Sequence, residues 1–245
     1  MPIYKHRQGA ISYGHSIGML MIDCQIPFIP GDIGNSQTFE YPVLYKALKD
    51  VSIERLIDNG DTSMSPNVVE AAKYLESQGV RAITSDCGFM IYFQEAVTNA
   101  VNIPVMLSSL LQLPFIASLL KPSQSIAVIC ANAPRLTPEL ISMAFPANDR
   151  TIIVEGMQDQ PAFQSAILLE SGELDSEAIE REVIEVGKRL LQANPSIGAI
   201  LLECSDLPPY AKALQDSIHL PVFDFTTMID FVQAATARRR FDGTL

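Results

Sequence analysis

Two cysteines occupy equivalent places in a pattern that occurs twice in this sequence. Cys87 and Cys204 each follow an acidic residue at the end of an apolar run, and each precedes a helical pattern and a short apolar run opened by proline. An offset of 117 residues separates Cys87 from Cys204, and the same offset separates Pro104 from Pro221. Recurrence in one register without a gap indicates an internal duplication with one cysteine per copy. The candidate chemistry therefore centres on two matched thiols.

A thiol at the start of a helix is a candidate acid–base catalyst. The helix N-terminus favours the thiolate and lowers the pKa of a cysteine from ~8.5 towards ~3.5–7.5. Two such thiols on opposite sides of one carbon suit a reaction in which a proton leaves one face and another arrives at the opposite face. Cys24 and Cys130 have no such equivalence, and a buried cysteine is most often a small apolar core residue.

Composition and charge exclude several classes of protein. The 245 residues, 48% of them hydrophobic, suffice for one large domain or two small ones. The net charge of −11 argues against a nucleic-acid partner. The four cysteines form no C-x-x-C pair, which is typical of free thiols in the cytoplasm, where we expect the protein. No apolar run approaches the ~18–20 residues of a membrane span, so no membrane partner is expected.

Other catalytic signatures are missing or lie in the wrong context. The three histidines are scattered without ligand spacing, and no glycine-rich nucleotide motif occurs, so we expect neither a metal nor a cofactor. Gly14-His15-Ser16-Ile17-Gly18 matches G-x-S-x-G. Its strand follows the motif, whereas a nucleophile elbow needs a strand before it. The sequence therefore does not favour a serine hydrolase.

Apolar runs alternate with helical patterns along the chain. Strands are expected over residues 16–22, 52–57, 80–86, 103–107, 125–131, 151–155, 197–203 and 221–225. Helices are expected over a segment ending near Lys49, over 65–78, 89–101 and 108–120, from Thr137 onward, and over 175–192, 207–217 and 226–239. Such alternation predicts an α/β fold with mostly parallel sheets flanked by helices.

The duplication predicts two similar, pseudo-symmetric lobes with an active site in the cleft between them. Residues 1–110 plus 225–245 form the predicted lobe with Cys87, and residues 111–224 form the lobe with Cys204. Ligands of parallel sheets bind beyond the carboxyl ends of the strands, where both cysteines fall. Because side chains alternate along a strand, the acidic residues before the cysteines, Asp86 and Glu203, are expected to point away from the cleft.

The two cysteine motifs also carry a family resemblance. Ser85-Asp86-Cys87-Gly88 and Leu202-Glu203-Cys204-Ser205-Asp206 resemble those of the aspartate/glutamate racemase superfamily, which includes hydantoin racemases, maleate isomerases and arylmalonate decarboxylases. The run from Ile17 to Asp23 is similar to the first strand of glutamate racemases, whose aspartate assists a catalytic cysteine. Gly88-Phe89 departs from the family, because racemases carry a polar pair there.

The resemblance implies a cofactor-independent amino-acid racemase. In this interpretation Cys87 and Cys204 are the opposed acid and base, Asp23 assists them, and N–H or O–H donors hold the carboxylate of a planar intermediate. The candidate substrate-binding residues are Asn35, Ser36, Ser85, Gly88, Ala131, Asn132 and Ser205. Arg55 and Arg135 are candidates for a second carboxylate.

Several alternatives stay open at this stage. A decarboxylase or a cis–trans isomerase of the same superfamily would need only one of the cysteines. A non-catalytic protein that binds a small acid would need neither as an activated thiol. The expected partner is a small carboxylate or amino acid in each case, and the sequence does not decide whether the protein is a homo-oligomer.

Overall fold

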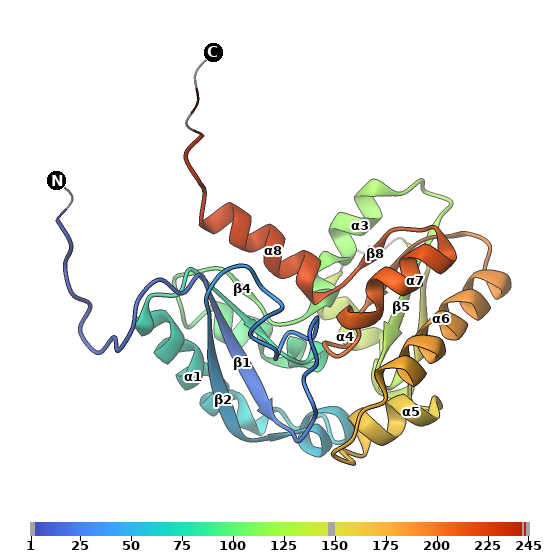
Figure 1. Cartoon of the computed structure of the whole chain (residues 1–245), viewed down its shortest axis with the longest axis horizontal. Coiled ribbons are helices and arrows are strands. Elements are labelled where there is room, and N and C mark those ends of the chain that lie inside the picture. The colour runs from blue at the N-terminus through green and yellow to red at the C-terminus, as the bar shows by residue number, and fades with distance from the viewer. Residues whose placement is uncertain (1–2, 147–149, 242, 244–245) are drawn as a thin grey trace.

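The computed structural model describes residues 3–146, 150–241 and 243, and it has two four-stranded parallel sheets (Figure 1). The first sheet has the order β2-β1-β3-β4, with β1 at Ile17–Asp23, β2 at Val43–Ser52, β3 at Ala82–Ser85 and β4 at Val105–Met106. The second has the order β6-β5-β7-β8, with β5 at Ser125–Cys130, β6 at Ile152–Gly156, β7 at Ile197–Leu202 and β8 at Val222–Phe223. The orders correspond strand by strand, which confirms the predicted α/β fold of two similar lobes.

Helices follow the second, third and fourth strands in both lobes, whereas only the second lobe has helices, η5 and α4, in the described segment between its first two strands. The longest are α1 (Ser65–Gln78) and α6 (Ser176–Ala193). Gly79 ends α1 in a left-handed conformation, with φ at 91°, and Asp175 caps α6 by accepting a hydrogen bond from the Ala178 amide. The others are η1 (Glu54–Asp58), η2 (Thr62–Met64), η3 (Gly88–Phe93), α2 (Gln94–Thr98), η4 (Ser109–Gln112), α3 (Leu113–Leu119), η5 (Ala133–Arg135), α4 (Pro138–Ala144), α5 (Pro161–Phe163), η6 (Gln164–Leu168), η7 (Pro208–Tyr210), α7 (Ala211–Ile218) and α8 (Phe225–Thr236).

The predictions of a helix ending near Lys49 and of a strand over 52–57 are wrong. The structure has the long strand β2 there, followed by the π-helical turn η1. Lys46, Ala47 and Leu48 favour a helix locally. Parallel pairing with β1, from Ile17 opposite Val43 onward, satisfies the β2 backbone instead and overrides that preference. The same pairing delivers η1 to the carboxyl end of the sheet.

Apolar packing holds the layers together. Strands β5 and β7 are buried along their whole length, as expected for strands covered on both faces. Helix α8 returns to the first sheet, where Phe225 and Ile229 join Ile17 and Met19 in one buried cluster. The proposed lobe boundaries stay a prediction, and their ends at 1–2, 242 and 244–245 lie outside the described residues.

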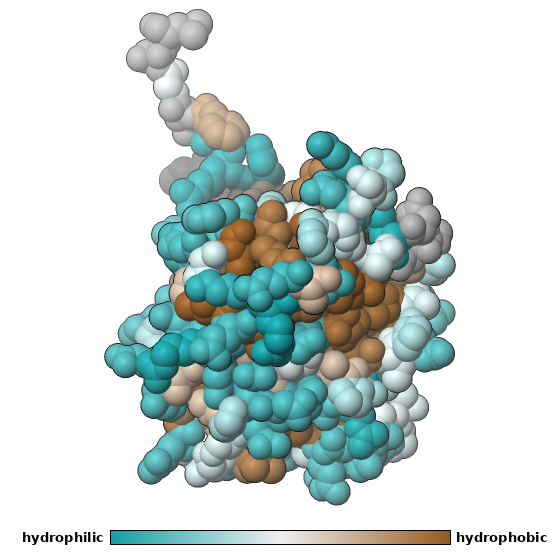
Figure 2. All heavy atoms as spheres, turned by 90° about the vertical axis from the view of Figure 1, so that its right-hand side faces the viewer, coloured by the Kyte–Doolittle hydropathy of each residue, from teal (hydrophilic) through white to brown (hydrophobic). Residues whose placement is uncertain are grey.

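The surface carries apolar areas between polar side chains, as Figure 2 shows for one face. The large apolar side chains that are more than half exposed include Phe115, Leu119, Met143 and Phe231. Whether such a surface joins two copies of the chain stays a prediction. Within the described residues, no helix combines the length and the apolar character needed to cross a bilayer.

Candidate active site

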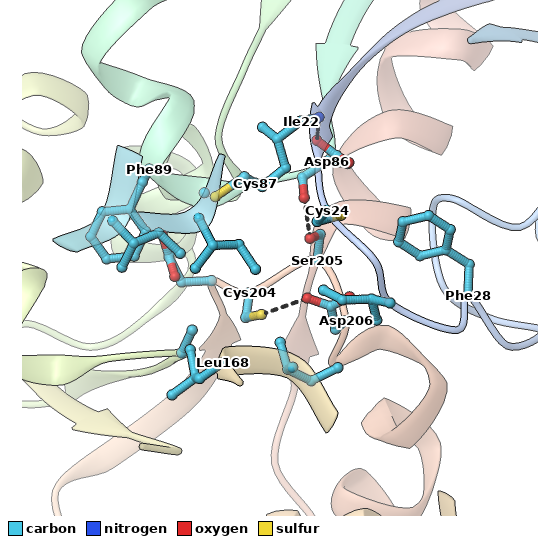
Figure 3. Close-up of a pocket in the computed structure, with 17 residues that line it drawn as sticks. Ile22, Cys24, Phe28, Asp86, Cys87, Phe89, Leu168, Cys204, Ser205 and Asp206 are labelled. Carbon is cyan, nitrogen blue, oxygen red and sulfur yellow. Dashed lines mark hydrogen bonds between the residues drawn. The ribbon is translucent and has the colours of Figure 1, made fainter. Parts of the chain in front are cut away.

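A pocket lies beyond the carboxyl ends of the central strands of both sheets (Figure 3). Its empty space is about 430 Å³, including the part that opens to solvent. The apolar part of its wall consists of Ile22, Ile26, Phe28, Ile53, Ile57, Phe89, Ala131, Ile167 and Leu168. The remaining lining residues are Cys24, Asp86, Cys87, Gly88, Glu203, Cys204, Ser205 and Asp206. The fold thus brings Cys87 and Cys204 into one pocket, and both are free thiols.

The two lobes contribute equivalent turns to the pocket wall, as they contribute equivalent thiols. The turns η1 and η6 are both π-helical, and each follows the second strand of its sheet. Ile53 and Ile57 approach the pocket from the first turn, and Ile167 and Leu168 from the second. The sequence patterns did not indicate these residues, because they predict a strand over 52–57 and no element over 161–168.

Burial dominates the acid–base properties of the two thiols. Desolvation raises the pKa of Cys87 well above its usual value, and nearby Glu203 raises it further. Desolvation also raises the pKa of Cys204, with Asp206 as the next cause. Backbone hydrogen bonds from Phe89 to Cys87 and from Asp206 to Cys204 oppose the rise only partly. The expectation that a helix start makes both thiols acidic is therefore wrong, because burial outweighs it.

The two thiols differ in one respect that the repeat does not predict. The Cys204 Sγ donates a hydrogen bond to Asp206 Oδ2 at 3.2 Å (Figure 3). The residue equivalent to Asp206 after Cys87, at the offset of 117, is Phe89. Only Cys204 therefore has a carboxylate at this position that can accept its proton. The pair of acid–base groups is unmatched.

Glu203 does not point away from the cleft as the strand alternation predicted. Strand β7 ends at Leu202, so the alternation no longer applies at Glu203. The Glu203 side chain lies against Gly88 of the other lobe, where an added Cβ would overlap Oε1. Glu203 is 1% exposed, and among the described residues neither carboxyl oxygen has a hydrogen-bond partner. Burial raises its pKa from 4.5 to about 8.

Asp86 is buried in the wall of the pocket but faces the neighbouring strand. Its Oδ1 accepts a hydrogen bond from the Ile22 amide at 2.8 Å, and desolvation raises its pKa well above the usual value. The Ser205 hydroxyl donates a hydrogen bond to the Asp86 carbonyl oxygen. This contact joins the two cysteine-bearing loops directly.

Two backbone amides complete the polar surface. Gly88 and Ser205 follow the two cysteines and are equivalent under the repeat. Both line the pocket, and no hydrogen bond of either N–H is found within the described part of the chain. These groups are donors suited to an anion such as a carboxylate.

The other predicted site residues lie outside the pocket lining. Asp23 and Ser36 are exposed, and Asn132 is half-buried. Asn35 supports the wall indirectly, because its Nδ2 donates a hydrogen bond to the carbonyl oxygen of Phe28 at 2.9 Å. Ser85 is buried, and its hydroxyl donates to the Leu107 carbonyl oxygen. Their roles in binding or catalysis stay predictions.

The two arginines considered for a second carboxylate are engaged elsewhere. Arg55 pairs with Asp61 at 2.7 Å, and Arg135 pairs with Asp58 at 3.8 Å. Among the described residues that line the pocket there is no lysine or arginine. The site is therefore acidic and apolar, and it has no fixed cation to hold a dicarboxylate.

The two-lobed α/β fold of this chain occurs in a known family of enzymes. The family model of Asp/Glu/hydantoin racemases matches residues 43–233, and this chain belongs to that family. It is also similar over 93% of its length to the structure of Picrophilus torridus aspartate racemase, which it covers to 96% with a TM-score of 0.60. At 16% identity this likeness shows the fold alone.

More similar sequences carry a different activity in their names. The chain is 32% identical over 224 residues to the dimethylsulfoniopropionate lyase of Durusdinium sp. clade D, which covers 88% of this chain and 73% of that protein. It is 33% identical over 239 residues to dimethylsulfoniopropionate lyase 7 of Emiliania huxleyi (strain CCMP1516). This match covers 92% of this chain and 69% of that protein. These names contradict the predicted amino-acid racemase and its isomerase class. The cysteine motifs indicated the family correctly but not the reaction.

Proposed function

We propose that this chain is a lyase that eliminates a neutral thioether from a small β-sulfonium carboxylate of the kind named in its dimethylsulfoniopropionate lyase relatives. The observation that carries the proposal is the hydrogen bond from the Cys204 thiol to Asp206 inside an apolar and acidic pocket. A thiol with its own proton acceptor is a base for a C–H bond. A pocket of this composition suits a cation that carries methyl groups.

The cationic end of such a substrate matches the side chains of the wall. A sulfonium sulfur bears a positive charge, and its methyl groups bury well against Ile53, Phe89 and Ile167. The ionised carboxylate of Asp206, a partly buried residue of the pocket wall, supplies the opposite charge. An amino acid with two carboxylates would instead place a second negative charge near Asp206. This contrast favours a substrate with one carboxylate and one cation.

The carboxylate end of the substrate is assigned to the backbone. The N–H groups of Gly88 and Ser205 hold it, one from each cysteine-bearing loop. Removal of a proton from the adjacent carbon moves negative charge onto the carboxylate oxygens. Donors that are already in place stabilise this charge without a reorganisation step.

The elimination then follows from the Cys204–Asp206 pair. Asp206 takes the thiol proton, and the thiolate removes a proton from the carbon next to the substrate carboxylate. The electron pair of that C–H bond forms the C=C bond, while the C–S bond breaks and its electrons leave on the thioether sulfur. The products are an acrylate, the thioether and the proton that Asp206 passes to solvent.

The asymmetry of the two thiols agrees with this reaction. A racemase needs two acid–base groups of matched pKa on opposite faces of one carbon, whereas an elimination needs one base. Asp206 stands beside Cys204, and Phe89 stands at the equivalent position beside Cys87. The roles assigned here are therefore base for Cys204 and a neutral wall thiol for Cys87.

The test is direct. The purified protein is incubated with dimethylsulfoniopropionate, dimethyl sulfide is measured by headspace gas chromatography and acrylate by proton NMR, and equal amounts are expected. Cys204→Ser should lower kcat/KM by ~10²-fold or more. Cys130→Ala is the matched control, because Cys130 is buried but does not line the pocket. A folded wild-type protein that releases no dimethyl sulfide at any pH would refute the proposal.

A further inference from the structure

A buried acidic residue of the first lobe, Asp32, lies next to Asp206, the proton acceptor of the proposed base Cys204. Asp32 belongs to the loop between β1 and β2 and is only 3% exposed. The loop packs against the segment that follows Cys204, since a Cβ added at Gly31 would lie 3.0 Å from Pro209 Cα. Gly31 has a φ of +98°, so glycine serves here both the turn and the close approach. The approach brings Asp32 to the second lobe.

The Asp32 side chain is held in a defined position. Its Oδ1 accepts a hydrogen bond from the Gly34 amide at 2.7 Å. Its carboxyl group is also hydrogen bonded to the carboxyl group of Asp206. Asp206 in turn accepts the hydrogen bond from Cys204. Hydrogen bonds therefore connect Asp32 through Asp206 to the Cys204 thiol.

Two carboxyl groups can share a hydrogen bond only when one of them carries a proton. The titratable groups that interact with this pair are all acids: Cys24, Tyr45, Asp86, Cys87, Cys204 and Tyr210. Among the described residues none of the groups found to act on the pair is a lysine, arginine or histidine, so no positive charge allows both carboxyls to ionise. The Tyr210 hydroxyl is buried near the pair and has no hydrogen-bond partner among the described residues.

Asp32 is the more deeply buried of the two residues, because Asp206 is only partly buried and lines the pocket. Burial and the charge of Asp206 raise the pKa of Asp32 well above its usual value. Burial also raises the pKa of Asp206, but the hydrogen bonds from Cys204 and Asp32 lower it in part. Deeper burial favours the neutral form of Asp32, and the hydrogen bond from Cys204 favours the ionised form of Asp206, so Asp32 is assigned as the donor in this pair.

We infer that Asp32 is a positioning residue that donates a proton in a hydrogen bond to Asp206 and so keeps Asp206 ionised to accept the proton of Cys204. The inference rests on the proposed function, in which Cys204 acts as the base. The Asp32 loop comes from the first lobe, whereas Cys204 and Asp206 follow β7 of the second. The base is thus complete only when the two lobes are docked.

Two substitutions separate the hydrogen bond from the charge. In Asp32→Asn the amide still donates to Asp206 and still accepts from Gly34, so the pH profile should stay close to that of the wild type. In Asp32→Leu the donor is lost, and Asp206 becomes protonated at a higher pH. The pH at which Cys204 reactivity rises to half of its maximum should then increase by about one unit relative to the wild type. At a pH below the midpoints of both proteins, the variant should therefore react ~10-fold more slowly. Gln37→Ala, an exposed position in the same loop, is the control.

The primary measurement needs no substrate. The rate of Cys204 alkylation by iodoacetamide is followed against pH by peptide mass spectrometry, and circular dichroism checks that each variant is folded. A folded Asp32→Leu with the wild-type alkylation profile would overturn the inference, and so would an Asp32→Asn profile shifted as far as that of Asp32→Leu. Dimethyl sulfide release is measured separately. If the wild type releases none, the proposed function fails while the alkylation profiles still decide the role of Asp32.

Discussion

Glu203 should make the protein less stable as the pH rises through neutrality. It is fully buried and has no hydrogen-bond partner within the described residues, and burial raises its pKa from 4.5 to about 8. Below pH 4.5 the carboxyl group is protonated in both the folded and the unfolded state. Between 4.5 and about 8 the unfolded chain releases this proton and the folded protein keeps it. The free energy of unfolding therefore falls across that window and levels off above it.

The size of the effect follows from the same pKa values. The rise from 4.5 to about 8 corresponds to ~5 kcal/mol when the whole window is crossed. Other buried acids, among them Asp86 and Asp224, add to the slope of the wild type. The contribution of Glu203 is isolated as the difference between the wild type and Glu203→Gln. This difference should grow by up to ~5 kcal/mol between acid and alkaline pH, in favour of the variant.

Urea unfolding followed by circular dichroism at a series of pH values measures this difference. The buried amide of Glu203→Gln adds an offset of its own, but that offset does not depend on pH. Glu173→Gln changes an exposed residue and should show no pH-dependent difference. If the wild type and Glu203→Gln differ by a constant amount at all pH values, Glu203 is already ionised in the folded state and the reasoning fails.

Three further predictions concern the site. Asp206→Asn should lower kcat/KM for elimination by ~10²-fold, because an amide cannot take the Cys204 proton, and an unchanged rate in the dimethyl sulfide assay would contradict this. Gly88→Ala should destabilise the protein by ~1–3 kcal/mol in urea unfolding, because the new Cβ overlaps Glu203. A stable, active variant would show that the loops that carry Cys87 and Cys204 can separate. A neutral thioether analogue, 3-(methylthio)propionate, should bind more weakly than dimethylsulfoniopropionate in calorimetry, because it lacks the cation that the Asp206 carboxylate attracts; equal affinity would argue against recognition of charge.

The internal duplication could be recognised from the sequence because the same residue types recur at one constant offset. It predicted two parallel sheets, and with them the meeting of Cys87 and Cys204. The carboxyl ends of parallel strands lie on the same edge of a sheet, so residues that follow the strands are gathered there whatever their separation in the chain. The family resemblance depends on the same motifs and was confirmed. These features are local patterns repeated at a fixed offset, and no tertiary information is needed to find them.

Other features depend on contacts between distant segments. Pairing with β1 made a strand of β2 against its local preference, and that strand carries Ile53 to the pocket. Burial reversed the expected acidity of Cys87 and Cys204, because desolvation reflects the whole surrounding structure and not the following helix alone.

The acid–base partners of the site were decided in the same way. The sequence places Asp206 two residues after Cys204, but only the fold shows that the thiol donates to it while Phe89 occupies the matching position beside Cys87. Asp32 reaches the pair from 174 residues away through the close approach of Gly31 and Pro209. Sequence by itself therefore determined the fold and the two thiols. The tertiary structure decided which thiol has a proton acceptor, because that depends on which side chains the docked lobes bury together.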